Sequence, residues 1–332
     1  MAEETIDRDL PTPDTSVLAA VPPRKRRWSE RLPVISHLRQ SVGLQRGMLV
    51  TGLVITGIFI LVAIFAPLIA PYSWAQQAVD GVKFGTQQPP SASNILGTTV
   101  SGFDVFSRVV WGAQTALLVI IAAIACSIFV GILLGLLSGY FGGWLDRILV
   151  VVCDAIYAFP SLLLAIVMSI VISRGQSNLW AGVMATALSI TVVFVPQYFR
   201  VIRAEVVRVR AEPFVESAKV IGVPTGRILL RHVLRNSTRS LPVVVTLNAS
   251  EALLTLAGLG FLGFGIEATS AAEWGYDLNR AIADVTSGIW WTSIFPGIAI
   301  VLVVLGITLV GESLNDLSDP RLRTRRRAGG AA

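Results

Sequence analysis

Residues 113–138 read AQTALLVIIAAIACSIFVGILLGLLS, an apolar run that contains no Asp, Glu, Lys, Arg or His. A helix needs about 20 mostly apolar residues to cross a hydrocarbon core about 30 Å thick, so this run is long enough to span a bilayer. A buried helix of a soluble protein would instead carry charged residues that recur on one face. The run therefore predicts a transmembrane helix.

Five more apolar runs of similar length flank this one. They lie at residues 48–70, 148–172, 179–199, 241–265 and 289–311. Only Asp154 and Glu251 place acids inside them. The chain is 53% hydrophobic and 14% charged, against about 25% charged residues in soluble domains. We therefore predict an all-α integral membrane protein with six transmembrane helices. The first run is too long, and begins too far into the chain, for a cleaved signal peptide.

The distribution of Lys and Arg predicts the orientation of the spans. Eight of these residues precede the first span, Arg147 lies between the second and third, nine lie from Arg200 to Arg239, and five follow Asp319. Only four occupy the alternating loops. Because basic residues are enriched in cytoplasmic loops, both termini are expected in the cytoplasm. The basic segment before the first span is expected to attract anionic membrane lipid, with a partner site as the alternative.

This topology divides the chain into five parts. They are a partly disordered cytoplasmic tail at 1–46, a first transmembrane helix at 47–71, an irregular external loop at 72–112, a five-helix core at 113–312 and a cytoplasmic tail at 313–332. The core includes a cytoplasmic loop at 200–240.

The loop at 200–240 has internal helical order. After Pro213, which suits the first turn of a helix, an apolar stripe recurs at helical spacing: Phe214, Val215, Ala218 and Ile221. Gly222 permits a turn, and a second stripe follows at Ile228, Leu229, His232 and Val233. The pattern predicts a helix, a turn and a second helix. Periodicity leaves two interpretations open, a loop packed on its own bundle or on lipid, and a docking surface for a cytoplasmic partner.

The residues of this loop also carry a family resemblance. Glu216, Ser217 and Ala218, followed by Gly222, resemble the Glu, Ala, Ala, three residues, Gly pattern of permeases in binding-protein-dependent ABC importers. The later run Arg231, His232, Val233, Leu234, Arg235, Asn236 resembles the peptide branch of that family. Ser217 stands where Ala is usual, and Arg235 where Pro is usual.

Further motifs extend the resemblance over about residues 48–321. They are Leu96-Gly97-Thr98, Gly102 to Arg108, Gly139-Tyr140, Asp146, Asp154, Ala158 to Leu164, Phe261 to Gly265, Trp274-Gly275 and Asp316 to Arg321. Thr99, Phe103 and the region of Leu256 depart from the family pattern. The chain is similar to the second, C-type permease of the dipeptide and oligopeptide branch, which also includes nickel permeases. The resemblance implies the type I ABC importer permease fold.

The resemblance implies a non-catalytic subunit that takes up di- or oligopeptides across the plasma (inner) membrane, with nickel, glutathione or another small solute as the alternative. It implies a homologous second permease, twelve helices in total, two cytoplasmic ATPase subunits that hold ATP and magnesium, and an extracytoplasmic binding protein. The chain itself has no phosphate-binding loop and only three lysines, so no cofactor is expected on it. The expected ATPase-coupling residues are Phe214, Val215, Glu216, Ala218, Ile221, Gly222, Ile228 and His232.

Polar residues at membrane depth are candidates for the translocation path. Glu251 lies ten residues into its span, about 15 Å by helical rise, near the midplane. Such acids face a bundle interior or a water-filled cavity. Glu251 is expected either to line the path near the amino terminus of a peptide or to pair with Asn248. Asp154 is expected either to line the path or to form a structural pair. No metal site is expected, since His37 and His232 are the only histidines. No nucleic-acid partner is expected, because the Lys and Arg residues are distributed according to the membrane topology.

Overall fold

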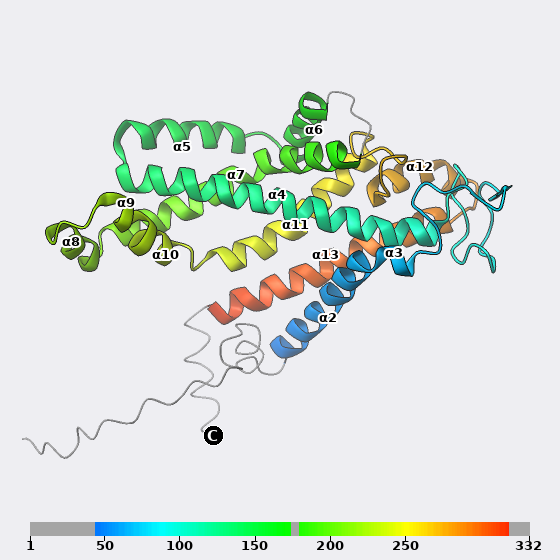
Figure 1. Ribbon diagram of the computed structural model, residues 1–332, viewed down its shortest axis with the longest axis horizontal. Coiled ribbons are helices and arrows are strands. Elements are labelled where there is room, and N and C mark those ends of the chain that lie inside the picture. Colours follow the sequence, from blue (N-terminus) through cyan, green and yellow to red (C-terminus); the bar gives the residue numbers. More distant parts are fainter. Residues whose placement is uncertain (1–43, 174–178, 319–332) are drawn as a thin grey trace, which may run out of the picture. The chain divides into compact units, whose positions relative to one another are not determined.

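The computed structural model describes residues 44–173 and 179–318, which form a bundle of helices (Figure 1). The predicted tails fall largely at residues 1–43 and 319–332, outside the described residues. The elements are α2 (Leu44–Ile64), α3 (Ala66–Ile69), β1 (Ala78–Val79), β2 (Val82–Lys83), α4 (Val105–Phe141), α5 (Gly143–Tyr157), α6 (Ser161–Ser173), α7 (Leu179–Arg210), α8 (Pro213–Val220), α9 (Thr225–Arg227), the π-helical turn η3 (Ile228–Val233), α10 (Leu234–Ser237), α11 (Leu241–Phe261), α12 (Trp274–Thr286) and α13 (Trp291–Ser318).

Five of the described helices, α2, α4, α7, α11 and α13, are long and apolar enough to cross a membrane. The pair α5 and α6 makes a sixth span if it is counted as one, but the two helices are bent by 98°. The prediction of one continuous helix at 148–172 is therefore wrong. Pro160 lies at the break, and it lacks an N–H for helical hydrogen bonding and disfavours helical backbone at Phe159.

Helix α4 begins earlier than expected, because residues 105–112 are helical rather than part of a loop. Asp104 precedes the helix, and its carboxylate accepts a hydrogen bond from the Ser107 backbone N–H at 2.7 Å. Asn94 donates a second bond to the same carboxylate at 2.9 Å. A capping carboxylate satisfies an N–H group that would otherwise lack a partner at a helix start. Polar residues just before the apolar run thus extend the helix.

The segments that connect α3 to α4 and α11 to α13 are more ordered than predicted. The expected irregular loop at 72–112 contains the antiparallel pair β1–β2. Helix α12 was not predicted, and it lies at the same end of the bundle as this hairpin, here called the α12 end (Figure 1). Helices α8, α9 and α10 lie at the opposite end, here called the α8 end (Figure 1).

A stripe of small residues brings α4 and α7 together. Gly131, Gly135 and Gly139 recur every fourth residue and face Tyr198, Ile202 and Val206 of α7. A Cβ atom added to Gly131 would lie 2.4 Å from the Tyr198 Cβ atom, so no side chain fits there without movement. Membrane helices associate through such stripes because close backbone approach increases van der Waals contact.

Ion pairs fix the turn where α4 meets α5. Arg203 of α7 donates two hydrogen bonds to the Asp146 carboxylate, at 2.6 and 2.7 Å, and Ser138 donates to the same group. Arg210 donates to the backbone carbonyls of Gly139 and Tyr140 at 3.0 and 2.9 Å. These contacts anchor α4 and α5 to the end of α7 from which α8 continues.

Candidate functional site

The first candidate region is residues 211–240, which connect α7 to α11 and form the α8 end. Helix α8 starts at Pro213 as predicted, with Glu212 preceding it in extended conformation. The predicted turn follows. Gly222 has φ +84°, a left-handed conformation that suits glycine. The Val223 N–H donates to the Ala218 carbonyl and the Gly222 N–H to the Lys219 carbonyl, both at 3.0 Å. This pair of bonds is the Schellman termination of a helix.

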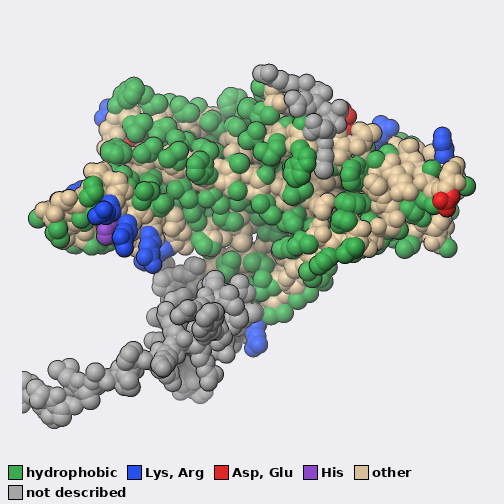
Figure 2. Space-filling view, in the orientation of Figure 1, with side chains coloured by type: hydrophobic (Ala, Val, Ile, Leu, Met, Phe, Trp, Pro, Cys, Tyr) green, Lys and Arg blue, Asp and Glu red, His purple; other side chains and the backbone are tan. Residues whose placement is uncertain are grey.

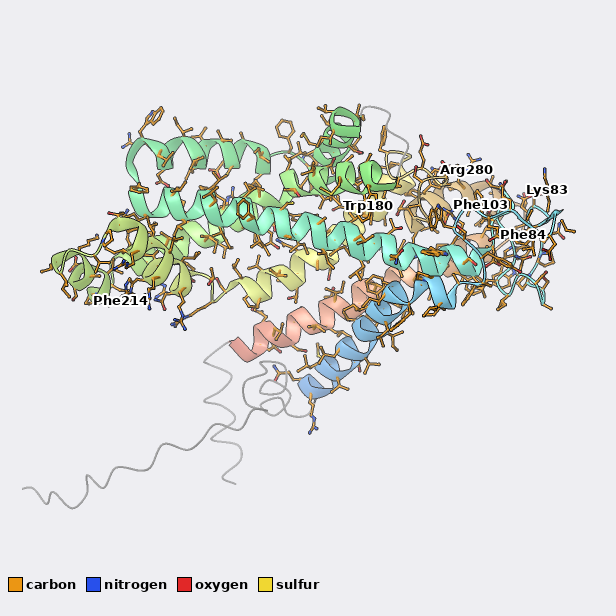
Figure 3. All side chains as sticks on the ribbon, viewed as in Figure 1. Lys83, Phe84, Phe103, Trp180, Phe214 and Arg280 are labelled. Carbon is orange, nitrogen blue, oxygen red and sulfur yellow. The ribbon has the colours of Figure 1, made fainter. Side chains whose placement is uncertain are left out.

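The predicted apolar stripe of α8 is divided between two faces. Val215 and Ala218 are buried and belong to the core of the bundle. Phe214 is exposed at the α8 end (Figure 3), and Ile221 is 80% exposed, as is its neighbour Val220 at 88%. Of the two interpretations left open, packing on the bundle applies to Val215 and Ala218, whereas Phe214 and Ile221 remain exposed. Because successive residues of a helix are rotated by about 100°, Val215 and Ala218 face the core, whereas Phe214 and Ile221 face outward.

The second short helix follows the same division. Ile228, Leu229 and Val233 are buried in the core, while Leu230 is exposed. His232 is half-buried, and its backbone carbonyl accepts a bond from the Asn236 amide at 2.7 Å. This helix is a π-helical turn between α9 and α10, in which backbone hydrogen bonds join residues five apart instead of four.

Charge at the α8 end is mostly basic and exposed. Figure 2 shows Lys, Arg and His side chains gathered there. Arg227, Arg231, Arg235 and Arg239 recur every fourth residue and are all exposed. Within the described residues none of these four forms an ion pair. Glu216 is also exposed, in the first turn of α8, where a carboxylate interacts favourably with the helix dipole.

The second candidate region lies between α5, α6, α7 and α11, and two of the three predicted path residues, Glu251 and Asn248, line it. A cavity of about 260 Å³ is lined by Glu251, Gln197, Tyr157 and Ser161, among others. A second cavity, of about 310 Å³, is lined by Asn248, Arg200, Gln197 and Tyr157. Tyr157 and Gln197 line both cavities, which places the two side by side.

Asp154 and Glu251 differ in their partners. Asp154 accepts a hydrogen bond from the Arg200 guanidinium at 2.7 Å, and the guanidinium also lies 4.3 Å from the centre of the Tyr157 ring. The expected bond between Glu251 and Asn248 is not formed. In the part of the chain that the structure describes, the Glu251 carboxylate forms no hydrogen bond or ion pair and faces its cavity.

Sequence reasoning missed Tyr157, Gln197 and Arg200. The signal was present in part, because Gln197 and Arg200 stand three residues apart, as Asn248 and Glu251 do, and such pairs share a helix face. The contribution of Tyr157 depends on the bend at Pro160, which a prediction of one straight span could not show.

A buried charge cluster at the α12 end was also missed. Arg108 of α4 forms an ion pair with Asp277 of α12 at 2.7 Å, with both side chains buried. Glu273 accepts bonds from the Gly275 and Tyr276 N–H groups at 2.8 and 2.7 Å. The pKa of Glu273 is raised to about 8, because burial and the Asp277 charge outweigh the two N–H bonds and the Arg108 charge, which lower it.

Among the described residues, no group of three or more His, Cys, Asp or Glu side chains lies close enough together to hold a metal ion.

Comparison with known proteins places this geometry in a family. Residues 131–324 match the model described as binding-protein-dependent transport system inner membrane component. Residues 44–90 match the N-terminal transmembrane domain of oligopeptide transport permease C.

Curated relatives match over most of their length. The dipeptide transport system permease protein DppC of Alkalihalophilus pseudofirmus is 37% identical over 275 residues, which cover 83% of this chain and 86% of the relative. The glutathione transport system permease protein GsiD of Escherichia coli is 35% identical over 276 residues, covering 83% and 87%. The motifs of the α8 end, the apolar spans and these matches agree, and the chain belongs to the family of inner membrane components of binding-protein-dependent transport systems.

Proposed function

We propose that this chain is one permease subunit of an ATP-driven importer that takes up di- or oligopeptides across the plasma membrane. The observation that carries the proposal is the α8 end, where exposed Val220 and Ile221 accompany buried Val215 and Ala218 on one short helix. The family membership and the named dipeptide relative support the same reading.

The divided helix suits a mechanical connection. Phe214, Glu216, Ile221 and Gly222 are exposed and are the residues that meet a cytoplasmic ATPase subunit. Apolar anchors one helical turn apart fit a groove on such a partner. Val215, Ala218 and Ile228 are buried and carry any displacement of α8 into the core. His232 is half-buried and so is intermediate between the exposed and the buried set. Closure of two ATPases on ATP and magnesium then moves the spans as rigid bodies.

The importer is completed by other chains. A homologous second permease supplies six more spans, so that the path lies between the two permeases, and an extracytoplasmic binding protein delivers the substrate. In this arrangement both termini and the α8 end are cytoplasmic, as the Lys and Arg distribution predicts. This chain supplies no ATP site.

Orientation is tested by single-cysteine labelling of intact cells. Cys126 and Cys153 are first replaced by Ala, and Thr225→Cys or Thr86→Cys is then introduced at an exposed position. An impermeant thiol reagent added outside should label the second variant and spare the first. Labelling of Thr225→Cys alone contradicts the topology.

Function is tested by uptake into cells that lack endogenous peptide importers. The chain is produced with its second permease, ATPases and binding protein, and labelled dipeptide, tripeptide, glutathione and nickel are compared. Uptake of peptide that requires the ATPases supports the proposal. Glutathione is the second candidate, because relatives named for glutathione transport are nearly as similar as the dipeptide relative. Uptake of nickel without peptide overturns the peptide assignment.

A further inference from the structure

The two cavities between α5, α6, α7 and α11 carry opposite charges. Among the described lining residues, Glu251 is the only charged side chain of the first cavity and Arg200 the only one of the second. The remaining lining is neutral, with Tyr157 and Gln197 shared between them. The volume of each cavity is close to that of the smallest ligand pockets of proteins, about 300 Å³.

Both charged groups have unused capacity for a ligand. The Glu251 carboxylate has no hydrogen bond or ion pair within the described residues, although an ionised group at membrane depth is costly without a partner. Arg200 gives one hydrogen bond to Asp154, from Nη2, out of the five N–H donors of a guanidinium. Its other donors remain for a second carboxylate. The Arg200–Asp154 pair thus keeps the guanidinium in place when the site is empty.

The spacing of the charges follows from two antiparallel helices. Helix α7 runs toward the α8 end and α11 runs away from it (Figure 1). Along each helix the two lining residues, Gln197 and Arg200 or Asn248 and Glu251, are three residues apart, a rise of about 4.5 Å. Arg200 and Asn248 therefore lie nearer the α8 end than Gln197 and Glu251. An extended dipeptide covers about 7 Å, less than the backbone separation given by this offset and an interaxial distance of about 8–10 Å, and the long Glu251 and Arg200 side chains span the remainder.

We propose that these joined cavities bind a zwitterionic peptide, with Glu251 receiving its ammonium group and Arg200 its terminal carboxylate. This inference rests on the proposed function and adds the chemistry of the substrate contact. Neutral Tyr157 and Gln197 between the charges contact the peptide backbone without selecting its side chains. A hydrated metal ion fits poorly, because Glu251 is the only acidic ligand in its cavity.

The site is tested in proteoliposomes that hold the complete permease and ATPase complex. Ser161 lines the first cavity, so Ser161→Cys in a background lacking Cys126 and Cys153 reports occupancy through its rate of thiol labelling. The probes are Ala-Ala, its N-acetyl derivative and its C-terminal amide. Ala-Ala should protect the cysteine at concentrations about tenfold lower than either blocked peptide.

Charge variants assign each end of the peptide. Glu251→Gln should abolish the advantage of Ala-Ala over N-acetyl-Ala-Ala while keeping its advantage over the amide, and Arg200→Gln should do the reverse. Glu251→Asp and Arg200→Lys keep the charges and should keep both preferences, which separates binding from folding. Glu312→Gln and Arg46→Gln, on exposed positions of α13 and α2, are matched controls that should change neither.

The outcomes separate this site from the wider function. If the wild-type complex with its binding protein transports no peptide, the proposed function fails and the site falls with it. If the wild type transports Ala-Ala but all three peptides protect Ser161→Cys equally, the function stands and the site is wrong. The same conclusion follows if Glu251→Gln retains the preference for a free amino group.

Discussion

The two ends of the bundle differ in the burial and pairing of their charged side chains. At the α12 end, one pair of oppositely charged side chains is buried, the ion pair of Arg108 with Asp277, while Lys83 and Arg280 are exposed. Figure 3 shows Lys83, Phe84, Phe103 and Arg280 close together around that end, and Phe214 alone at the other. At the α8 end, apolar and basic groups are left exposed. We therefore expect the α12 end to stabilise the chain itself and the proposed ATPase partner to cover the α8 end.

The largest effect is expected from Arg108→Ala at the α12 end. This change leaves Asp277 buried without its partner, and breaking a buried pair in this way costs about 3–5 kcal/mol. Thermal unfolding of the detergent-solubilised complex, followed with abundance in the membrane, measures the loss. Arg208→Ala removes an exposed arginine paired with Glu205 and Glu212 and is the matched control, with little expected loss because exposed ion pairs contribute little to stability. Similar stability of both variants contradicts the contrast between the ends.

The second prediction concerns Gly222→Trp at the α8 end. A Cβ atom there would meet no other atom within 4 Å, so the site has space for a side chain, and positive φ adds about 1–2 kcal/mol of strain. The variant should reach the membrane at near normal abundance, yet lose the ATPases in detergent and transport at least about tenfold less peptide, because its side chain enters the partner's surface.

Gly288→Trp is a close control for this experiment. Gly288 also has positive φ, at +80°, and open space around its Cβ position, but it follows α12 at the other end. It should therefore suffer the same strain and still retain the ATPases. Normal transport by Gly222→Trp, or its loss through degradation alone, removes the support for coupling at the α8 end.

Sequence patterns predicted the two ends unequally. Apolar runs, Pro213 and Gly222 act locally, so the spans and the turn of the α8 end followed from propensity and periodicity. The bend between α5 and α6 and the pairing of Arg108 with Asp277 depend on contacts between residues far apart in the chain. Periodicity gave the stripe of α8 but not which face the core would cover, and it gave Glu251 but not Arg200 as the opposite charge across the cavities.

The third prediction uses pH at the α12 end. Because the pKa of Glu273 is raised to about 8 from 4.5, the folded chain holds one more proton than the unfolded chain between these values. Stability from this group is complete below pH 4.5 and decreases as pH rises toward 8, by up to about 1.4 kcal/mol per unit. Hydrogen exchange of the α12 amides from pH 5 to 8 measures the slope. Glu273→Gln should flatten it, and Glu267→Gln, at an exposed position, should leave it unchanged.

The smallest stability effect is expected for Ile221→Ser, and it tests the division of α8 most directly. Ile221 is 80% exposed, so its replacement by a polar residue should alter stability by no more than about 0.5 kcal/mol. Val215 is fully buried in the same helix, and Val215→Ala removes two methyl groups from the core, at a cost of about 2 kcal/mol. If Ile221 meets a partner, Ile221→Ser should weaken ATPase retention although the chain folds normally. Val215→Ala should instead lower the unfolding temperature while leaving the outer contact chemistry intact. Measured on the same preparations, ATPase retention should therefore fall more in Ile221→Ser, and the unfolding temperature should fall more in Val215→Ala. If Ile221→Ser retains the ATPases as firmly as the wild type, the exposed anchor has no partner, and the inner face alone explains why α8 is apolar.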